Sequence, residues 1–286
     1  MAFCFILPGI IANSSPENQM EKLIKTGRVF YGIAMAGVGF QQISYADFPA
    51  MILPPLHPWI PGLHFWAYFS GAALMASGAA IIFEKKAKIT SLALGGILLA
   101  LFCFYYIPYE IIVDPYYNYL GDWTDAEKEL ALSGGGFVIA GSFPEEKDIA
   151  PNKSFLRKLL EGITPFGGIF FSITMISFGI DHFLYTKHVA LLVPSWIPHP
   201  VFWTYFAAVA LIGSGTAIIL KFKLKVIATL LGTMIFLWFI FLHMPRAIAN
   251  LFIDTGSELT SAFSALAFSG IAFIIAGEMK WRETNL

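Results

Sequence analysis

Six polar or aromatic residues in the second half of the chain are the best candidates for chemistry. They are Asp181, His182, Trp196, His243, Arg246 and Glu258. Imidazole and carboxyl groups exchange protons, and a guanidinium stabilises negative charge that develops on a bound group. An indole supplies a flat apolar wall. The set predicts a ligand pocket in which His182 or His243 donates to a carbonyl oxygen, but it identifies no catalytic residue.

The spacing of these residues limits which of them can interact. His243 and Arg246 are three residues apart, so on a helix they share a face. Asp181 and His182 are adjacent, which turns their side chains about 100° apart and makes them poor mutual partners. An arginine near the hydrocarbon is costly unless it reaches water or an acid. We therefore predict that Asp181 pairs with Arg246, with Glu258 as the alternative acid.

Other kinds of site find little support in the sequence. There is no HExxH motif and no dense spacing of His and Asp, so we predict no metal site. The two cysteines, Cys4 and Cys103, lack the Cys-x-x-Cys spacing of dithiol–disulfide exchange. Phosphate-binding loops, nucleophile elbows and nucleic-acid patches are also missing, and we expect no nucleic-acid partner.

The composition places the candidate residues in a membrane protein. The chain is 57% hydrophobic and 13% charged, with a mean hydropathy of +0.69, outside the range of soluble globular proteins. Eight apolar stretches are long enough to cross the ~30 Å hydrocarbon core as helices. They are residues 27–44, 63–83, 89–108, 127–143, 166–184, 201–220, 226–245 and 260–277. We predict an all-α membrane protein with eight transmembrane helices.

The second half of the sequence repeats the first. Pairs that lie 140 positions apart include Gly39 and Gly179, Tyr45 and Tyr185, and Pro54 and Pro194. The stretch FWAYF at 65–69 recurs as FWTYF at 202–206. A repeat of this length indicates a duplicated membrane domain, and four helices per copy give both copies the same orientation. We predict two parallel four-helix repeats.

The two copies differ in their ionisable groups. The second copy has Asp181 and His182 where the first has Gln41 and Gln42, and it has His243 and Arg246 where the first has Tyr106 and Tyr109. Ionisable residues within a membrane are functional candidates by default. We therefore place the working site in the second copy, at its outer end.

Basic residues predict the orientation in the membrane. Fifteen of the eighteen Lys and Arg flank one side of the spans, which the positive-inside rule makes cytoplasmic. They are Lys22, Lys25, Arg28, Lys85, Lys86, Lys88, Lys147, Lys153, Arg157, Lys158, Lys221, Lys223, Lys225, Lys280 and Arg282. Both termini are then cytoplasmic, and we expect the bacterial cytoplasmic (inner) membrane.

These boundaries divide the chain into five parts. They are an N-terminal segment (1–26), disordered or interfacial; repeat 1 (27–143); a cytoplasmic linker (144–165); repeat 2 (166–279); and a cytoplasmic tail (280–286). The apolar start of the N-terminal segment is too short to span a bilayer.

Four stretches of the second copy resemble the DoxX family of membrane proteins. They are GIDHF at 179–183, VPSWIP at 193–198, FWTYF at 202–206 and HMPR at 243–246. The resemblance covers about residues 27–279, and the first copy resembles the same unit without its charged positions. It implies four-helix membrane units. Some members of the family are associated with quinone-linked sulfur oxidation or act beside redox enzymes, so the resemblance suggests a quinone ligand and a redox-enzyme partner.

Three classes of function are compatible with the sequence. A redox-associated subunit would hold a quinone-like or other lipophilic ligand in an outer pocket of repeat 2. A non-catalytic structural or chaperone subunit of a membrane complex would need no pocket and would tolerate loss of the histidines. A small-molecule transporter would need a polar path at the midplane, where the sequence offers little beyond Ser and Thr. We favour the first class.

Overall fold

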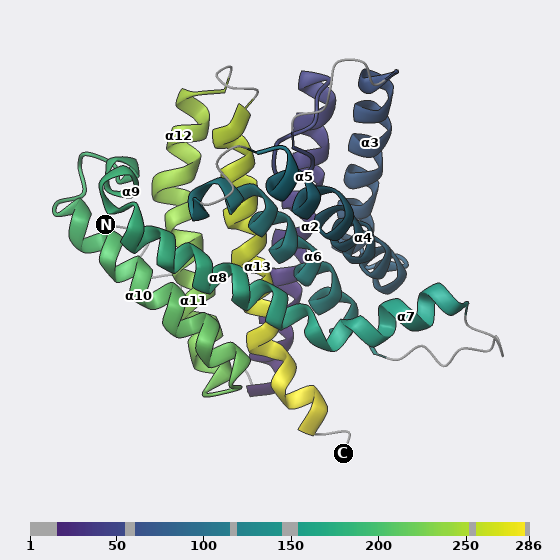
Figure 1. Cartoon of the computed structure of the whole chain (residues 1–286). Coiled ribbons are helices and arrows are strands. Elements are labelled where there is room, and N and C mark those ends of the chain that lie inside the picture. Colours follow the sequence, from purple (N-terminus) through teal and green to yellow (C-terminus); the bar gives the residue numbers. More distant parts are fainter. Residues whose placement is uncertain (1–15, 55–60, 115–118, 145–153, 252–255, 284–286) are drawn as a thin grey trace.

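The computed structural model describes residues 16–54, 61–114, 119–144, 154–251 and 256–283, and within these ranges it contains helices and no strands (Figure 1). Predictions for residues 1–15, for residues 145–153 of the linker and for the last three residues of the tail lie outside the described residues. The all-helical fold class is confirmed.

Every predicted span is helical, with ends that differ from the prediction by a few residues in most cases. The first half contains α2 (Pro16–Tyr45), α3 (Leu63–Ile82), α4 (Ala87–Leu101) and α6 (Thr124–Gly141). The second half contains α8 (Gly167–Leu184), α10 (Pro200–Ile219), α11 (Leu224–Trp238) and α13 (Ser257–Glu283). A π-helical turn continues α4 into α5 (Ile107–Ile112), and another continues α11 into α12 (Met244–Ala249).

Six of the helical runs are long and apolar enough to cross a membrane. They are Leu63–Ile82, Ala87–Ile112, Phe155–Leu184, Pro200–Ile219, Leu224–Ala249 and Ser257–Gly277. Large apolar side chains on their outer faces are exposed, as expected of helices that contact lipid. The length and composition of these helices therefore indicate an integral membrane protein. The other two predicted spans are less apolar, since α2 contains three glutamines and the first turns of α6 contain several charges.

Two parts of the domain prediction differ from the structure. α2 already begins at Pro16, so residues 16–26 continue the first long helix and do not form a separate segment. The linker contains the amphipathic helix α7 (Phe155–Ile163), which begins where the Ser154 hydroxyl accepts a hydrogen bond from the Arg157 amide. Leu160 and Ile163 of α7 pack on a small cluster that includes Phe137. The short helix α9 (Thr186–Leu192) follows α8.

Helices α6 and α13 lie at the centre of the bundle. α13 packs along α2 and α11, while α6 packs along α4 and α8, and the two central helices also touch each other (Figure 1). Glycines allow the closest approaches, because Gly27 lies against the Gly270 carbonyl and Gly167 lies against the Gly134 carbonyl. The residues buried at these crossings form most of the core.

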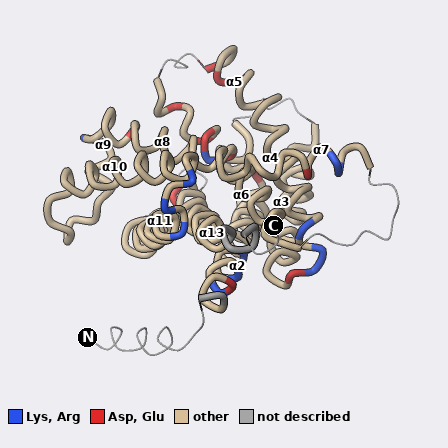
Figure 2. The backbone as a smooth tube through the Cα atoms, turned by 90° about the horizontal axis from the view of Figure 1, so that it is seen from below, with Lys and Arg blue, Asp and Glu red and all other residues tan. Residues whose placement is uncertain are grey.

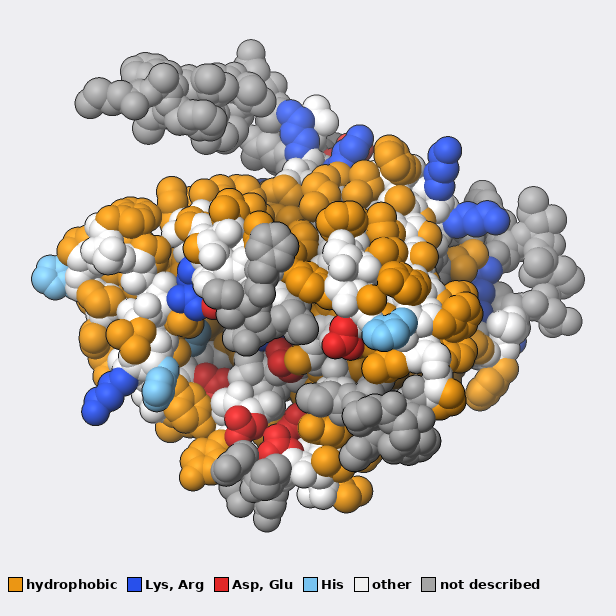
Figure 3. Space-filling view, turned by 90° about the horizontal axis from the view of Figure 1, so that it is seen from above, with side chains coloured by type: hydrophobic (Ala, Val, Ile, Leu, Met, Phe, Trp, Pro, Cys, Tyr) orange, Lys and Arg blue, Asp and Glu red, His pale blue; other side chains and the backbone are white. Residues whose placement is uncertain are grey.

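Charged residues divide between the two ends of the bundle. Seen from below, basic residues lie around the ends of α2, α3 and α7 (Figure 2). There the Arg28 guanidinium donates to Ser142, pairs with Glu84 at 3.1 Å and lies 3.6 Å above the Phe143 ring. Acidic side chains gather on the face seen from above (Figure 3). The acidic face is the end that holds the predicted site residues.

Candidate ligand pocket in the second half

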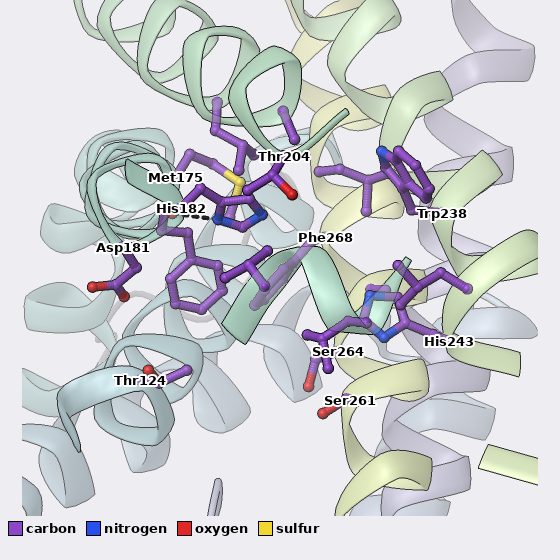
Figure 4. Close-up of a pocket in the computed structure, with 18 of the residues that line it drawn as sticks. Thr124, Met175, Asp181, His182, Thr204, Trp238, His243, Ser261, Ser264 and Phe268 are labelled. Atoms are coloured by element: carbon purple, nitrogen blue, oxygen red, sulfur yellow. Dashed lines mark hydrogen bonds between the residues drawn. The ribbon is translucent and has the colours of Figure 1, made fainter. Parts of the chain in front are cut away.

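A cavity of about 430 Å³ lies inside the second half of the chain, between α8, α10, α11 and α13. Its volume is in the range of small-molecule sites, and its walls are largely apolar. Three of the six predicted residues line it, namely Asp181, His182 and His243 (Figure 4). The structure therefore brings half of the predicted set together in one cavity.

His182 projects from the last turn of α8 into the cavity (Figure 4). Its Nδ1 atom is 2.7 Å from the carbonyl oxygen of Phe178, one turn earlier in the same helix. A carbonyl can only accept a hydrogen bond, so Nδ1 carries the hydrogen. This contact fixes the orientation of the ring and directs Nε2 away from the helix, toward the cavity.

His243 reaches the cavity from the opposite wall (Figure 4). It ends a π-helical turn (Phe239–His243) that comes just before Pro245 in α12. A proline removes a backbone donor and crowds the preceding turn, and the wider π turn relieves that crowding. The half-buried ring has a buried Nδ1 atom with no hydrogen-bond partner among the described residues. Two imidazoles from different helices thus face the same space.

Asp181 lies at the edge of the cavity, on the side of α6 near Thr124 (Figure 4). Its side chain is buried, and its Oδ1 atom has no hydrogen-bond partner among the described residues. Glu127 of α6 is close enough to Asp181 to repel its charge. A buried acceptor without a donor is expensive, and other buried residues, such as Glu129 of α6, share this state.

The predicted pair of Asp181 with Arg246 is wrong. Arg246 instead binds Glu258 through two hydrogen bonds, Nε to Oε2 at 3.0 Å and Nη2 to Oε1. Glu258 is in the first turn of α13, directly after the loop that follows α12, whereas Asp181 is turned toward α6. Neither Arg246 nor Glu258 is among the residues that line the cavity. Their pair joins two helices beside the site.

The aromatic wall is formed by tryptophans other than the one predicted. Trp196 is 66% exposed, packs edge-on against Phe241 and does not line the cavity. Trp203 and Trp238 do line it, with ring centroids 6.2 Å apart. Neither of these two tryptophans was among the residues predicted from the sequence. A tryptophan near the end of a membrane helix can face either lipid or a pocket, and its neighbours in the sequence do not show which. The rotation of α10 about its own axis decides this for Trp203.

Lys128 is a pocket residue that the sequence did not predict. It comes from α6 in the first half of the chain, yet it lines the cavity of the second half. Its ammonium is 2.8 Å from the Asp125 carboxylate, one turn earlier. In the sequence, Lys128 is one of the three basic residues that do not flank the basic side of the predicted spans.

The counterparts of the pocket residues in the first half take part in packing and internal hydrogen bonds. Met51 is fully buried, with its sulfur 2.8 Å from the Ser264 hydroxyl oxygen, whereas Leu191, 140 positions later, is 79% exposed. Gln42 donates to the Ala67 carbonyl at 3.0 Å and also to the Ser70 hydroxyl. The uncharged counterparts of the pocket residues are thus engaged in packing and internal hydrogen bonds.

Gln41 offers a direct test of that structural role. Its amide donates to the Gly256 carbonyl at 2.9 Å and to the Thr260 hydroxyl at 2.7 Å, so it ties α2 to the start of α13. We expect Gln41→Ala to lower the free energy of unfolding by about 1–3 kcal/mol, because buried acceptors lose their donor. Ser44→Ala is the control: the Ser44 hydroxyl bonds only its own helix, to Phe40, and its loss should cost under ~0.5 kcal/mol. Unfolding in mixed micelles measures both, and equal effects would contradict the role.

Comparison with known proteins adds no assignment. No family model, curated protein or solved structure matches this chain. The function is therefore argued from the cavity and the residues that surround it.

Proposed function

We propose that the chain is a redox-associated membrane subunit of the DoxX type, which holds a quinone-like or similarly lipophilic ligand in the cavity of its second half. The observation that supports this best is the pair of imidazoles, His182 and His243, on facing walls of a largely apolar cavity. A quinone head group is a flat ring with oxygens on opposite edges. It therefore matches two polar groups that face each other between aromatic walls.

Different residues of the cavity would make different kinds of contact with the ligand. His243 would donate to one ring oxygen, and Nε2 of His182, whose Nδ1 hydrogen is held by Phe178, would accept from the ring hydroxyl of the reduced form. Phe268 and Trp238 would supply flat surfaces beside the ring. Lys128, held by Asp125, adds a positive charge at the α6 side. A quinone bound here supplies two-electron redox chemistry, and the partner that exchanges those electrons would be a redox enzyme at the membrane surface.

We further propose that the protein is a tandem duplication with eight spans and cytoplasmic termini, in a bacterial cytoplasmic membrane. The packing supports a two-fold relation, because α2 lies on α3 as α8 lies on α10, and α4 on α6 as α11 on α13. Both copies have a π-helical turn before a proline. Corresponding hydrogen bonds, each 2.8 Å long, join Ser133 to the Gly95 carbonyl and Ser269 to the Gly232 carbonyl.

Ligand retention tests the function. Protein extracted in mild detergent and examined by native mass spectrometry should carry a quinone or its hydroquinone. His182→Ala and His243→Ala should each reduce its retention about tenfold or more, since each removes a hydrogen bond in an apolar site. Tyr106→Phe, at the position of the first half that corresponds to His243, is the matched control and should retain quinone as the unmodified protein does.

Other results would favour the remaining classes of function. Folded protein that retains no quinone and binds none when it is added, but copurifies with another membrane subunit, would indicate a structural role. A retained polar small molecule would indicate transport. Size-exclusion chromatography of each variant establishes that lost retention does not reflect lost folding.

A further inference from the structure

Several polar groups around the cavity present hydrogen-bond acceptors to it. The hydroxyls of three lining residues already donate to backbone carbonyls: Thr124 to Gly121, Thr204 to Pro200 at 3.0 Å, and Ser264 to Thr260 at 2.8 Å. The Trp203 indole N–H donates to the Pro198 carbonyl at 3.1 Å. Each hydroxyl has one hydrogen to give, so what remains toward the cavity is its oxygen lone pairs.

His182 follows the same pattern. Its Nδ1 hydrogen is engaged by the Phe178 carbonyl, so the neutral ring presents the lone pair of Nε2 to the cavity. An apolar wall favours the neutral ring, because an imidazolium buried without a partner would be costly. His243 can take either tautomer and does not discriminate between donors and acceptors. His182, whose tautomer is fixed, therefore presents an acceptor to the cavity.

Asp181 is an acceptor at a position where the first half of the chain has a donor. The residue 140 positions earlier, Gln41, uses its amide N–H groups to bind Gly256 and Thr260. A carboxylate has no hydrogen to donate, and Oδ1 of Asp181 is left without a partner among the described residues. An amide in this position can donate to the scaffold, as Gln41 does in the first half. A carboxylate cannot, but it can take a hydrogen from a bound ligand.

The charged neighbours of Asp181 do not supply such a hydrogen. From α6, Glu127 is itself an acceptor that takes the Ser177 hydroxyl hydrogen, and its Oε2 atom has no partner among the described residues. Lys128 donates one ammonium hydrogen to Asp125 and makes no hydrogen bond with Oδ1 of Asp181. From α8 itself, His182 donates to its own helix. Among the described residues, no charged neighbour therefore gives a hydrogen to Oδ1 of Asp181.

We infer that the cavity selects a ligand whose polar end carries hydroxyl hydrogens, so that it binds the hydroquinone state of its ligand in preference to the quinone state. This inference rests on the proposed function. A hydroquinone gives its hydrogens to acceptors such as Nε2 of His182 and the Asp181 carboxylate. A quinone has only carbonyl oxygens, and it would leave these acceptors buried and unpaired.

Calorimetric titration of purified protein under anaerobic conditions tests the preference. The probes are a decyl-substituted benzoquinone, its hydroquinone and the dimethyl ether of that hydroquinone. The hydroquinone should bind about tenfold or more tightly than either of the others, because the ether keeps the reduced ring but has no hydrogen to donate. Equal binding of all three, or tighter binding of the quinone, would overturn the inference and leave the proposed function standing. If none of the three binds, the proposed function fails as well.

A variant places the preference on a particular residue. His182→Gln introduces the side chain that the first half carries at Gln42, whose amide can donate as well as accept. The preference for hydroquinone over quinone should shrink at least about fivefold in this variant. Tyr106→Phe, in the first half, should keep the preference of the unmodified protein. A preference unchanged by His182→Gln would show that His182 does not set it.

Discussion

Gly167→Ala should destabilise the protein by about 2–3 kcal/mol, while Gly168→Ala, one residue later on the same helix, should be neutral or slightly stabilising. A Cβ on Gly167 would lie 2.6 Å from the Gly134 carbonyl oxygen and 2.9 Å from Cβ of Phe137. Both neighbours are atoms of α6 that cannot rotate away. A Cβ on Gly168 would have one contact, at 3.9 Å with a terminal methyl of Ile275.

The comparison separates packing from helix propensity. Both substitutions change glycine to alanine in the first turn of α8, so the gain in helix propensity is nearly the same. Only the crossing of α8 with α6 differs between them. Unfolding of each variant in mixed micelles, followed by tryptophan fluorescence, gives the two free energies. A Gly167→Ala protein as stable as Gly168→Ala would mean that the helices do not cross at this glycine.

Removing Glu258 should be the second large effect, with Glu258→Ala lowering the free energy of unfolding by about 2–4 kcal/mol. The Arg246 and Glu258 side chains are only 30% and 24% exposed and share two hydrogen bonds. Truncating the acid leaves a guanidinium partly buried at the rim of the bundle without its counter-ion. The two parallel hydrogen bonds need the planar guanidinium, which a lysine ammonium cannot replace. Arg246→Lys should therefore lose most of the stabilisation that the pair provides.

A double-mutant cycle isolates this pair from other roles of each residue. Glu258 lies in the first turn of α13, where an acid also interacts with the helix dipole, and the cycle cancels that contribution. Arg246→Ala combined with Glu258→Ala should cost less than the sum of the single changes, by about 1–3 kcal/mol. The same cycle with Asp181→Asn in place of Glu258→Ala should be additive. Coupling of Arg246 to Asp181 would instead restore the pair expected from the sequence.

Apolar runs were sufficient to locate the long helices. Residues 63–83 and 201–220 became α3 and α10 with ends that shift by a single residue. The cost of exposing backbone groups to hydrocarbon leaves a long apolar stretch in a membrane no alternative to a helix. Internal comparison was also informative, because it directed attention to Asp181, His182 and His243, which do line one cavity.

The tertiary structure alone decided which side chains meet. Successive residues on a helix point about 100° apart, so a small rotation about the helix axis changes a partner completely. Packing between the helices set those rotations. As a result, Asp181 is turned toward α6 and Arg246 binds Glu258. Trp203, rather than Trp196, lines the cavity. Lys128 reaches that cavity from the other half of the chain, because α6 packs on α8. Hydrophobic periodicity contains no information about such contacts between helices, because lipid-facing and protein-facing surfaces are both apolar.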